Sequence, residues 1–226
     1  EEIGLYAFQN CVNLKSVKVN DAMGLVSAGA FKGCTALEAI DFSESTLAMV
    51  GYEAFADCTS LKEVKLAETL SEVADYAFAN TQISTIEFGK NVNTVGSHSF
   101  LNASKLESIT VVDNNKEYSS VDGVLYNKDK TQIICYPMNH PQYLREKLGY
   151  NDTIWADNEK NLEFRARYEA DILTYVLPAT VETIGELAFA YANLRNIYLP
   201  EGLKRIETLG FFKLHQPKDQ WSNTPS

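Results

Sequence analysis

The sequence predicts an α/β solenoid, a right-handed stack of coils in which each repeat of about 23 residues supplies one short parallel strand. Three observations support this fold class. A phenylalanine returns at a nearly constant interval, a small residue stands directly before it, and a pair of apolar residues two positions apart follows it. A feature that recurs within one chain reflects contact between successive coils, so the repeat sets the architecture of all 226 residues.

The phenylalanine column has separations of 23, 24, 23 and 22 residues, and its last two members are 22 residues apart. This interval lies in the leucine-rich-repeat range of about 20 to 29 residues. A small residue beside each ring leaves room for the ring of the next coil. The rings are Phe8, Phe31, Phe55, Phe78, Phe100, Phe189 and Phe211, and the small residues are Ala7, Ala30, Ala54, Ala77, Ser99, Ala188 and Gly210. We therefore expect a leucine-rich-repeat coil stack.

The apolar pair after each phenylalanine indicates a strand with one face inward, because a single residue separates its two members. Ile40 and Phe42 form one such pair, and Val64 and Leu66 form the next. The Ala-Phe half of each coil ends in a polar turn and indicates one or two helical turns on the opposite side.

The period divides the single repeat domain 1–226 into segments. Five coils are expected over residues 1–112 and two over residues 174–212. Residues 113–137 contain two β-rich runs around a polar turn and predict a hairpin. Residues 138–173 form an insertion in which apolar residues both alternate and recur four positions apart, so strand and helix stay open. The remaining residues, 213–226, predict a C-terminal cap or tail.

The charge and the apolar content exclude some partners. A formal net charge of -10 and an isoelectric point near 4.8 argue against nucleic acid and anionic membrane surfaces, because either would repel the chain. No apolar run approaches the roughly 20 residues that span a bilayer, so direct membrane insertion is not expected. The chain starts inside a repeat at Glu1–Ile3, unlike a signal peptide. We expect a mature or trimmed chain whose targeting segment, if any, has been removed.

Three cysteines, Cys11, Cys34 and Cys58, each stand three residues after their phenylalanine and therefore share a column. Their separations of 23 and 24 residues match no metal-ligand spacing. In other coils the column holds small residues, namely Thr81, Ala103 and Ala192. We therefore expect buried free thiols that pack as small apolar groups. Cys135, in the predicted hairpin, has no evident partner.

The sequence carries no catalytic signature. A nucleophile with a base needs a histidine near a serine or cysteine, and His98 stands in a column that accepts many residue types and indicates a half-exposed surface position. The acidic turn Asp113–Glu117 is interrupted by a lysine, unlike a calcium loop. We expect no enzyme, no cofactor and no metal site.

The outward residues of successive strands form a first candidate binding surface. Neighbours in a parallel ladder lie about 4.8 Å apart, and opposite charges there attract by about 0.2 to 1 kcal/mol a pair. The first four residues alternate in charge, so the row is either a recognition strip or a self-neutralised solvated face. The row comprises Lys18, Asp41, Lys65, Glu87, Thr110 and Tyr198. A neighbouring row is small and mostly polar, as in a shallow groove for an extended chain or glycan: Ser16, Ala39, Glu63, Thr85, Ser108 and Asn196.

The insertion is the second candidate surface, because it combines aromatic rings with arginines, the residue types that concentrate binding energy. These side chains either anchor a protein ligand or cover the flank of the hairpin. Since the strand row balances its own charge, we expect the insertion to be the main anchor of a protein ligand. The candidates are Tyr143, Tyr150, Trp155, Arg165 and Tyr168.

The chain resembles the BspA-like leucine-rich-repeat family of bacterial and protist surface proteins. The resemblance rests on Gly51–Leu61, on Leu177–Phe189 and on the hairpin that starts at Asp122–Tyr126, and it covers roughly residues 1–137 and 174–212. It implies an exported or surface-attached, non-enzymatic protein of adhesion or host interaction. The insertion has no counterpart in that pattern.

Two functions follow as hypotheses. The first is a protein- or glycan-binding module of a bacterial cell-surface or secreted protein. The alternative is a structural spacer that holds another domain away from the cell and binds nothing tightly. A contiguous exposed aromatic patch favours binding, whereas a uniformly charged surface favours the spacer.

Overall fold

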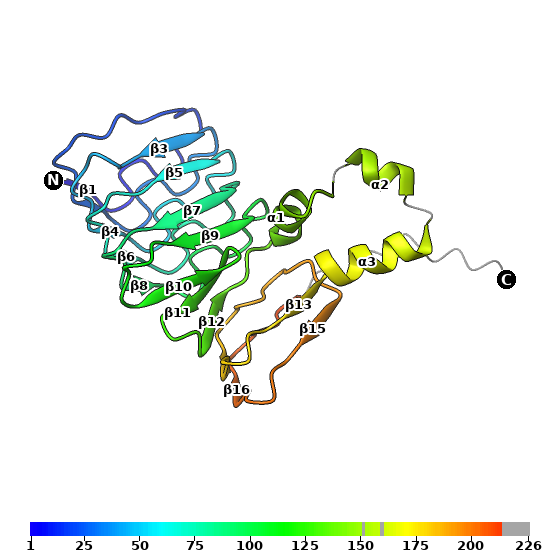
Figure 1. Cartoon of the computed structure of the whole chain (residues 1–226). Helices are drawn as coiled ribbons and strands as arrows, with labels where there is room; N and C mark the ends of the chain where they lie inside the picture. The colour runs from blue at the N-terminus through cyan, green and yellow to red at the C-terminus, as the bar shows by residue number, and fades with distance from the viewer. Residues whose placement is uncertain (151, 159–160, 214–226) are drawn as a thin grey trace.

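The computed structural model describes residues 1–150, 152–158 and 161–213, without the side chains of Asp152 and Trp155. The described residues form a coil stack, a hairpin, a helical insertion and two further coils (Figure 1). Strands of successive coils pair in parallel and in register, so the chain is a repeat solenoid. The predicted right-handed sense of the coil stays a prediction. The expected tail, 213–226, lies outside the described residues beyond Lys213.

Each complete N-terminal coil carries two short strands, where the sequence pattern predicts one. The unexpected strand ends at the valine or isoleucine five residues before each phenylalanine, and these side chains point into the core. Its members form one parallel sheet: β1 (Glu2–Ile3), β2 (Leu25–Val26), β4 (Met49–Val50), β6 (Glu72–Val73) and β8 (Thr94–Val95). A two-residue strand is too short to show a period of two, which is why the pattern misses it.

The expected strands form a second ladder on another face of each coil. These strands are β3 (Ala39–Asp41), β5 (Glu63–Lys65), β7 (Thr85–Phe88) and β9 (Ser108–Val111). β3 pairs with β5 and β7 pairs with β9, both in parallel, and β5 lies beside β7. Val64 and Ile86 point inward, as the pattern predicts. The first coil has no strand at the predicted positions 17–19, so this ladder begins at β3.

The Ala-Phe half of each coil is a series of tight turns and not the predicted helical turn. Alternate backbone N–H groups bond between coils: the Phe31 N–H donates to the Ala54 carbonyl (2.8 Å) and the Gly33 N–H donates to the Ala56 carbonyl (2.8 Å). The N–H groups between them close turns within the coil, as from Lys32 to the Gly29 carbonyl (3.0 Å). Two positions per coil also take a positive φ, for example Tyr76 and Asn80, both at 59°, except in the fifth coil, where Asn102 alone does. Because these bonds satisfy the N–H and carbonyl groups of the backbone, no helical i→i−4 bonds are required.

One positive-φ column forms a polar ladder that the sequence pattern does not reveal. Asn80 Nδ2 donates to Asp57 Oδ1 (2.7 Å), and Asn102 Nδ2 donates to Asn80 Oδ1 (2.7 Å). In the second coil Gly33 takes φ 74°, and a Cβ there would lie 2.3 Å from Asn10 Oδ1. Asn, Asp and Gly are the residues that tolerate left-handed backbone best. The column therefore combines a required backbone shape with side-chain bonds between coils.

The phenylalanine column is the centre of the core. The Phe55 ring stacks on Phe31 at a centroid distance of 5.1 Å and on Phe78 at 5.5 Å, with the planes within 8° of parallel. Phe42 approaches Phe55 edge-on at 6.2 Å. These rings are fully buried, whereas Phe8 in the first coil is 37% exposed because only one neighbour covers it. The predicted stacking of coil on coil is therefore confirmed.

The hairpin region joins the two coil stacks. β10 (Tyr118–Val121), β11 (Val124–Asn127) and β12 (Gln132–Cys135) form an antiparallel meander whose second turn spans 128–131. β12 then pairs in parallel with β14 (Thr183–Ile184), which pairs with β16 (Arg205–Ile206). The second sheet of the C-terminal coils is separate and contains β13 (Thr174–Val176) and β15 (Asn196–Tyr198).

The insertion is helical, which settles the alternative that its sequence leaves open. It contains α1 (His140–Lys147), α2 (Asp152–Asn158) and α3 (Leu162–Ile172). In Figure 1 α1 lies beside β9 and α2 lies away from the coils, while α3 contacts β13. The Asn161 side chain caps α3 by accepting bonds from the backbone N–H groups of Glu163 and Phe164 (3.0 and 3.1 Å). A side-chain cap of this kind stabilises the start of a helix by about 1 kcal/mol.

The cysteine column is buried only where coils lie on both sides. Cys34 and Cys58 are fully buried free thiols, and each donates to a carbonyl of the preceding coil, Phe8 O (3.0 Å) and Phe31 O (3.1 Å) respectively. Cys11 is exposed, so its predicted burial is wrong, because the first coil has one uncovered side. Cys135 is a partly exposed residue, but burial of its thiol raises the pKa to about 12.

Replacement of Phe55 by alanine should lower the free energy of unfolding by about 3 to 5 kcal/mol, because it leaves a ring-sized cavity between two coils. Phe8→Ala is the matched control and should cost clearly less, since Phe8 is partly exposed. Thermal melts compare the two variants with the parent. A Phe55→Ala melting temperature within a degree or two of the parent would contradict the stacking model.

Thiol labelling of the native protein at neutral pH should modify Cys11 first. Burial raises the pKa of Cys34, and raises those of Cys58 and Cys135 to about 12, so these thiols stay protonated and unreactive. Mass spectrometry after brief maleimide treatment locates the label, and Cys11→Ser should leave a nearly inert native protein. Rapid labelling of Cys34 or Cys58 without denaturant would show that the column opens.

Candidate functional site

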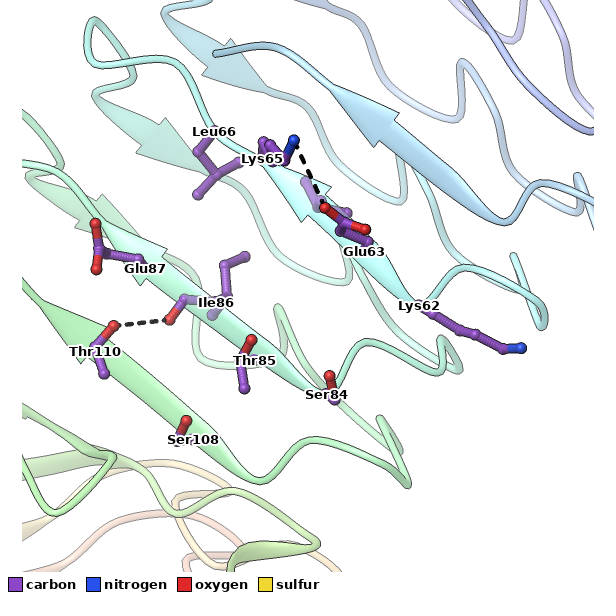
Figure 2. Close-up of a pocket in the computed structure, with 11 residues that line it drawn as sticks. Lys62, Glu63, Lys65, Leu66, Ser84, Thr85, Ile86, Glu87, Ser108 and Thr110 are labelled. Atoms are coloured by element: carbon purple, nitrogen blue, oxygen red, sulfur yellow. Dashed lines mark hydrogen bonds and ion pairs between the residues drawn. The ribbon is translucent and has the colours of Figure 1, made fainter. Parts of the chain in front are cut away.

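The outward face of β5, β7 and β9 contains an open hollow of about 750 Å³ (Figure 2). Hydroxyl groups line its floor, from Ser84 and Thr85 at β7 and from Ser108 and Thr110 on β9. Two lysines and two glutamates surround the hydroxyls, namely Lys62, Lys65, Glu63 and Glu87. The alternation that turns Val64 and Ile86 into the core turns their neighbours on β5 and β7 outward, namely Glu63, Lys65, Thr85 and Glu87.

Two further hollows continue the first one across the strand face. One, of about 480 Å³, lies over the first two coils and includes Lys18, Asp41 and Ser43. The other, of about 420 Å³, shares Ser43 with it and shares Leu66 and Glu87 with the hollow of Figure 2. The three form one band from the first coil to the fifth, which we call the strand-face groove.

Charge in the strand-face groove is paired near its centre and in the third hollow, where Lys90 Nζ lies 2.6 Å from Glu68 Oε1. Lys65 Nζ lies 3.1 Å from Asp41 Oδ2 and 3.8 Å from Glu63 Oε1. Hydrogen bonds from Ser43, together with Lys65, lower the pKa of Asp41 to about 2. Among the described residues, no ion pair joins Lys18 to Asp41 or Lys65 to Glu87. The exposed Glu87 carboxylate stands where two hollows meet.

Tyr198 does not join the other members of its predicted row. It lies on β15, in a separate sheet with β13, whereas Thr110 lies on β9. The Tyr198 side chain is 60% exposed and stands in register beside Val176, which is 66% exposed. The C-terminal coils thus present a small apolar strand face, apart from the polar strand-face groove.

The insertion begins at the edge of the strand-face groove. The Asn139 N–H donates to the Leu106 carbonyl (2.7 Å), and His140 Nδ1 donates to the Glu107 carbonyl (3.1 Å). Glu107 directly precedes Ser108, which lines the groove. Figure 1 shows α1 beside β9, at the boundary between the two coil stacks.

The root of α1 is a buried aromatic cluster around His140, which the sequence reasoning missed. The His140 ring is fully buried and lies 4.9 Å from Tyr136, 5.4 Å from Tyr143 and 6.4 Å from Tyr175. Burial lowers the pKa of His140 to about 4, so the ring is neutral at pH 7. An ion pair between Lys147 of α1 and Asp122 of the hairpin region is a second contact that fixes α1 to the rest of the chain.

The predicted binding rings of the insertion also hold its helices together. Tyr150 packs against Phe164 (5.7 Å) and Tyr168 (5.4 Å), and its hydroxyl donates to Asp171 Oδ2 (2.7 Å). Tyr143 stacks on His140. These rings are half-buried, and so is Arg165 on α3. The Trp155 side chain lies outside the described residues, and a binding role for this set stays a prediction.

The most exposed apolar side chains of the insertion are aliphatic. Leu162 is 78% exposed, Leu148 is 52% exposed and Ile154 is 39% exposed. They lie at the start of α3, just after α1 and within α2. The sequence analysis did not select these three residues, because their spacing follows neither a strand nor a helix period. They give the insertion an outer surface unlike the polar groove beside it.

Ser97, His98 and Asp75 come together on another face, but their geometry does not form a catalytic relay. Ser97 Oγ lies 3.1 Å and Asp75 Oδ1 lies 3.4 Å from the same ring nitrogen, Nδ1 of His98. A relay needs the base to bridge its partners through two different nitrogens. The His98 side chain is 18% exposed, less than expected.

The described residues contain no group of three or more His, Cys, Asp or Glu side chains placed to hold a metal ion. Within the same residues, none of the helices has the length and apolar character needed to span a bilayer.

The family model described as BspA type leucine rich repeat region matches six copies over residues 1–128 and 160–218, more than half of the chain. The chain therefore belongs to the BspA-type leucine-rich-repeat family. Leucine-rich-repeat families of this kind are generally non-enzymatic, and the match indicates no catalytic domain.

Three solved bacterial structures share the fold. A leucine rich cell surface protein from Faecalibacterium prausnitzii is 22% identical at a TM-score of 0.64, over 92% of this chain and 51% of that one. The pneumococcal vaccine antigen PcpA is 24% identical at 0.60, over 92% and 52%. A leucine-rich repeat protein from Eubacterium ventriosum is 23% identical at 0.58, over 85% and 51%. The chain thus spans about half the length of these proteins. No curated protein matches it at a significant level.

The buried His140 should make the fold sensitive to mild acid. Its pKa is about 4 in the folded chain and 6.5 in its ordinary state, so between these values the unfolded chain binds more protons. The free energy of unfolding should therefore fall as the pH is lowered from about 6.5 to about 4, by roughly 3 kcal/mol in total from this residue. Denaturant melts at several pH values measure the slope.

The His140→Phe variant isolates this contribution, because other carboxylates and histidines also titrate in the window. We expect a shallower pH dependence in the His140→Phe variant than in the parent. Equal slopes for the parent and His140→Phe would contradict the assignment to His140.

Proposed function

We propose that the chain is a non-enzymatic binding module of a bacterial cell-surface or secreted protein, and that it holds an extended protein or glycan ligand in adhesion or host interaction. The continuity of the three hollows along the strand face is the observation that carries this proposal. Its surface location draws support from membership of the BspA-type family and from the fold shared with a leucine rich cell surface protein.

The lining of the strand-face groove suits a polypeptide better than a sugar chain. Two lysines and two glutamates around the central hollow offer partners for both signs of charge, and the hydroxyls between them both donate and accept hydrogen bonds. The residues that line the three hollows include no aromatic ring on which a sugar could stack. A polypeptide with mixed charge is therefore the favoured ligand, and a glycan is the second candidate.

The insertion is proposed as an apolar contact beside the strand-face groove. Leu148 and Leu162 are exposed, whereas Tyr150 bonds to Asp171 within the insertion. Replacement of the two leucines should therefore change ligand binding without changing the stability of the fold. Alanine at Tyr150 would instead remove contacts between helices. A ligand that enters the groove near β9 would meet α1 at its edge.

The test begins with protein and glycan arrays probed with the labelled chain, followed by affinity measurements on each hit. The double charge reversal Lys65→Glu with Glu87→Lys should weaken a groove ligand by about tenfold or more. Both side chains are exposed, so the fold should be little affected. The matched control is Lys204→Glu with Glu182→Lys. It reverses an ion pair whose Nζ–Oε2 distance is 2.8 Å and whose residues do not line the groove.

The insertion has its own variant, Leu148→Ser with Leu162→Ser, which should weaken protein ligands but not glycans. Binding unchanged by the groove reversal would contradict the proposed site. Failure to bind anything on either array would favour the structural spacer.

A further inference from the structure

A row of three aromatic rings lies on a different face of the coils from the strand-face groove. Tyr52, Tyr76 and His98 come from three successive coils and follow the strands β4, β6 and β8. Tyr76 stacks on His98 at 4.7 Å with an interplanar angle of 23°, and Tyr52 meets Tyr76 edge-on at 5.6 Å. Tyr52 remains 47% exposed. We call these residues the tyrosine ledge.

The backbone and the core do not account for the ring at Tyr76. Its φ is 59°, and the same turn position takes a positive φ in other coils with quite different residues, namely Gly29, Glu53 and Leu187. The Tyr76 side chain is only half-buried and lies outside the buried core. Neither the turn nor the core therefore requires an aromatic ring at this position.

Carboxylates border the tyrosine ledge. The Asp75 side chain is 44% exposed and lies beside His98, and Glu186 lies 3.4 Å from Ser97 across the junction of the two stacks. Glu53 is also near but is paired with Lys32 at 2.6 Å. Burial raises the pKa of Tyr76, and the neighbouring Tyr52 and then the nearby carboxylates raise it further. A cationic partner would be favoured here.

Arginine fits this combination better than lysine does. A guanidinium group is planar, so it can stack on a tyrosine ring while its N–H groups bond to a carboxylate in pairs. The rings are held by one another, so they lose little side-chain freedom on binding. Tyrosine is also among the residues that dominate the energetics of protein interfaces.

We propose that Tyr52, Tyr76 and His98, together with Asp75 and Glu186, form a docking surface for an arginine-bearing segment of a partner protein. This surface is independent of the strand-face groove, because the two share no residue and lie on different faces of the coils. It is also a contiguous, partly exposed aromatic patch, the feature that favours a binding module over a structural spacer.

The test uses a fluorescent Gly-Arg-Gly-Arg-Gly peptide, with lysine and citrulline versions, and anisotropy at physiological salt. The affinity should be highest for the arginine peptide, lower for the lysine peptide and lowest for the citrulline peptide, because citrulline keeps the planar shape but carries no charge. Tyr76→Asn should lower the arginine-peptide affinity about tenfold while keeping the melting temperature, since Asn tolerates the left-handed backbone. Asp75→Asn should act in the same direction, since it removes a charge and keeps the oxygen that accepts from the His98 N–H.

Two matched controls separate the tyrosine ledge from general attraction to an acidic chain. Tyr198→Ala removes an exposed ring elsewhere, and Glu87→Gln removes an exposed carboxylate from the strand-face groove. Neither should change the affinity more than about twofold. The proposal is overturned if Glu87→Gln weakens binding as much as Asp75→Asn, or if Tyr76→Asn binds as the parent does. Binding of maltotetraose that is lost in Tyr76→Asn would assign the surface to a glycan and also overturn it.

Discussion

The structure depends on the stacking of each coil against the next. A single coil cannot enclose its apolar side chains, so Phe55 is buried only because Phe31 and Phe78 cover its two faces. The same register carries backbone bonds from coil to coil and aligns the outward side chains in rows. The strand-face groove and the tyrosine ledge are both consequences of this alignment. Where a coil has one neighbour only, as at Phe8 and Cys11, burial is lost.

The columns of buried side chains were predictable from the sequence, whereas the backbone features that depend on hydrogen bonds to a neighbouring coil were not. The phenylalanine column and the inward Val64 and Ile86 follow from spacing alone. The two-residue strands and the turns do not, because they are too short to produce a period and depend on bonds to a neighbouring coil. The helical nature of α3 did not follow from its ambiguous pattern, although Asn161 caps its first turn.

The candidate sites show the same division. The central members of the strand row, Lys65 and Glu87, do line a groove, because strand alternation places them outside. Tyr198 is separated from them, because the hairpin ends one ladder before β13 and β15 begin another. The tyrosine ledge escaped prediction because Tyr52 and Tyr76 stand in adjacent columns. Only the offset between coils brings their rings together.

The insertion leaves the stack after the Asn139 bond to Leu106 and returns at β13, so its helices lie outside the register of both ladders. Residues added to or removed from the segment between α1 and α3 would therefore leave the coil-to-coil contacts unchanged. Evolution can vary the length and composition of this segment while the solenoid keeps its stability. Sequence in this segment can therefore diverge before sequence in the coils, where each column is constrained by its neighbours.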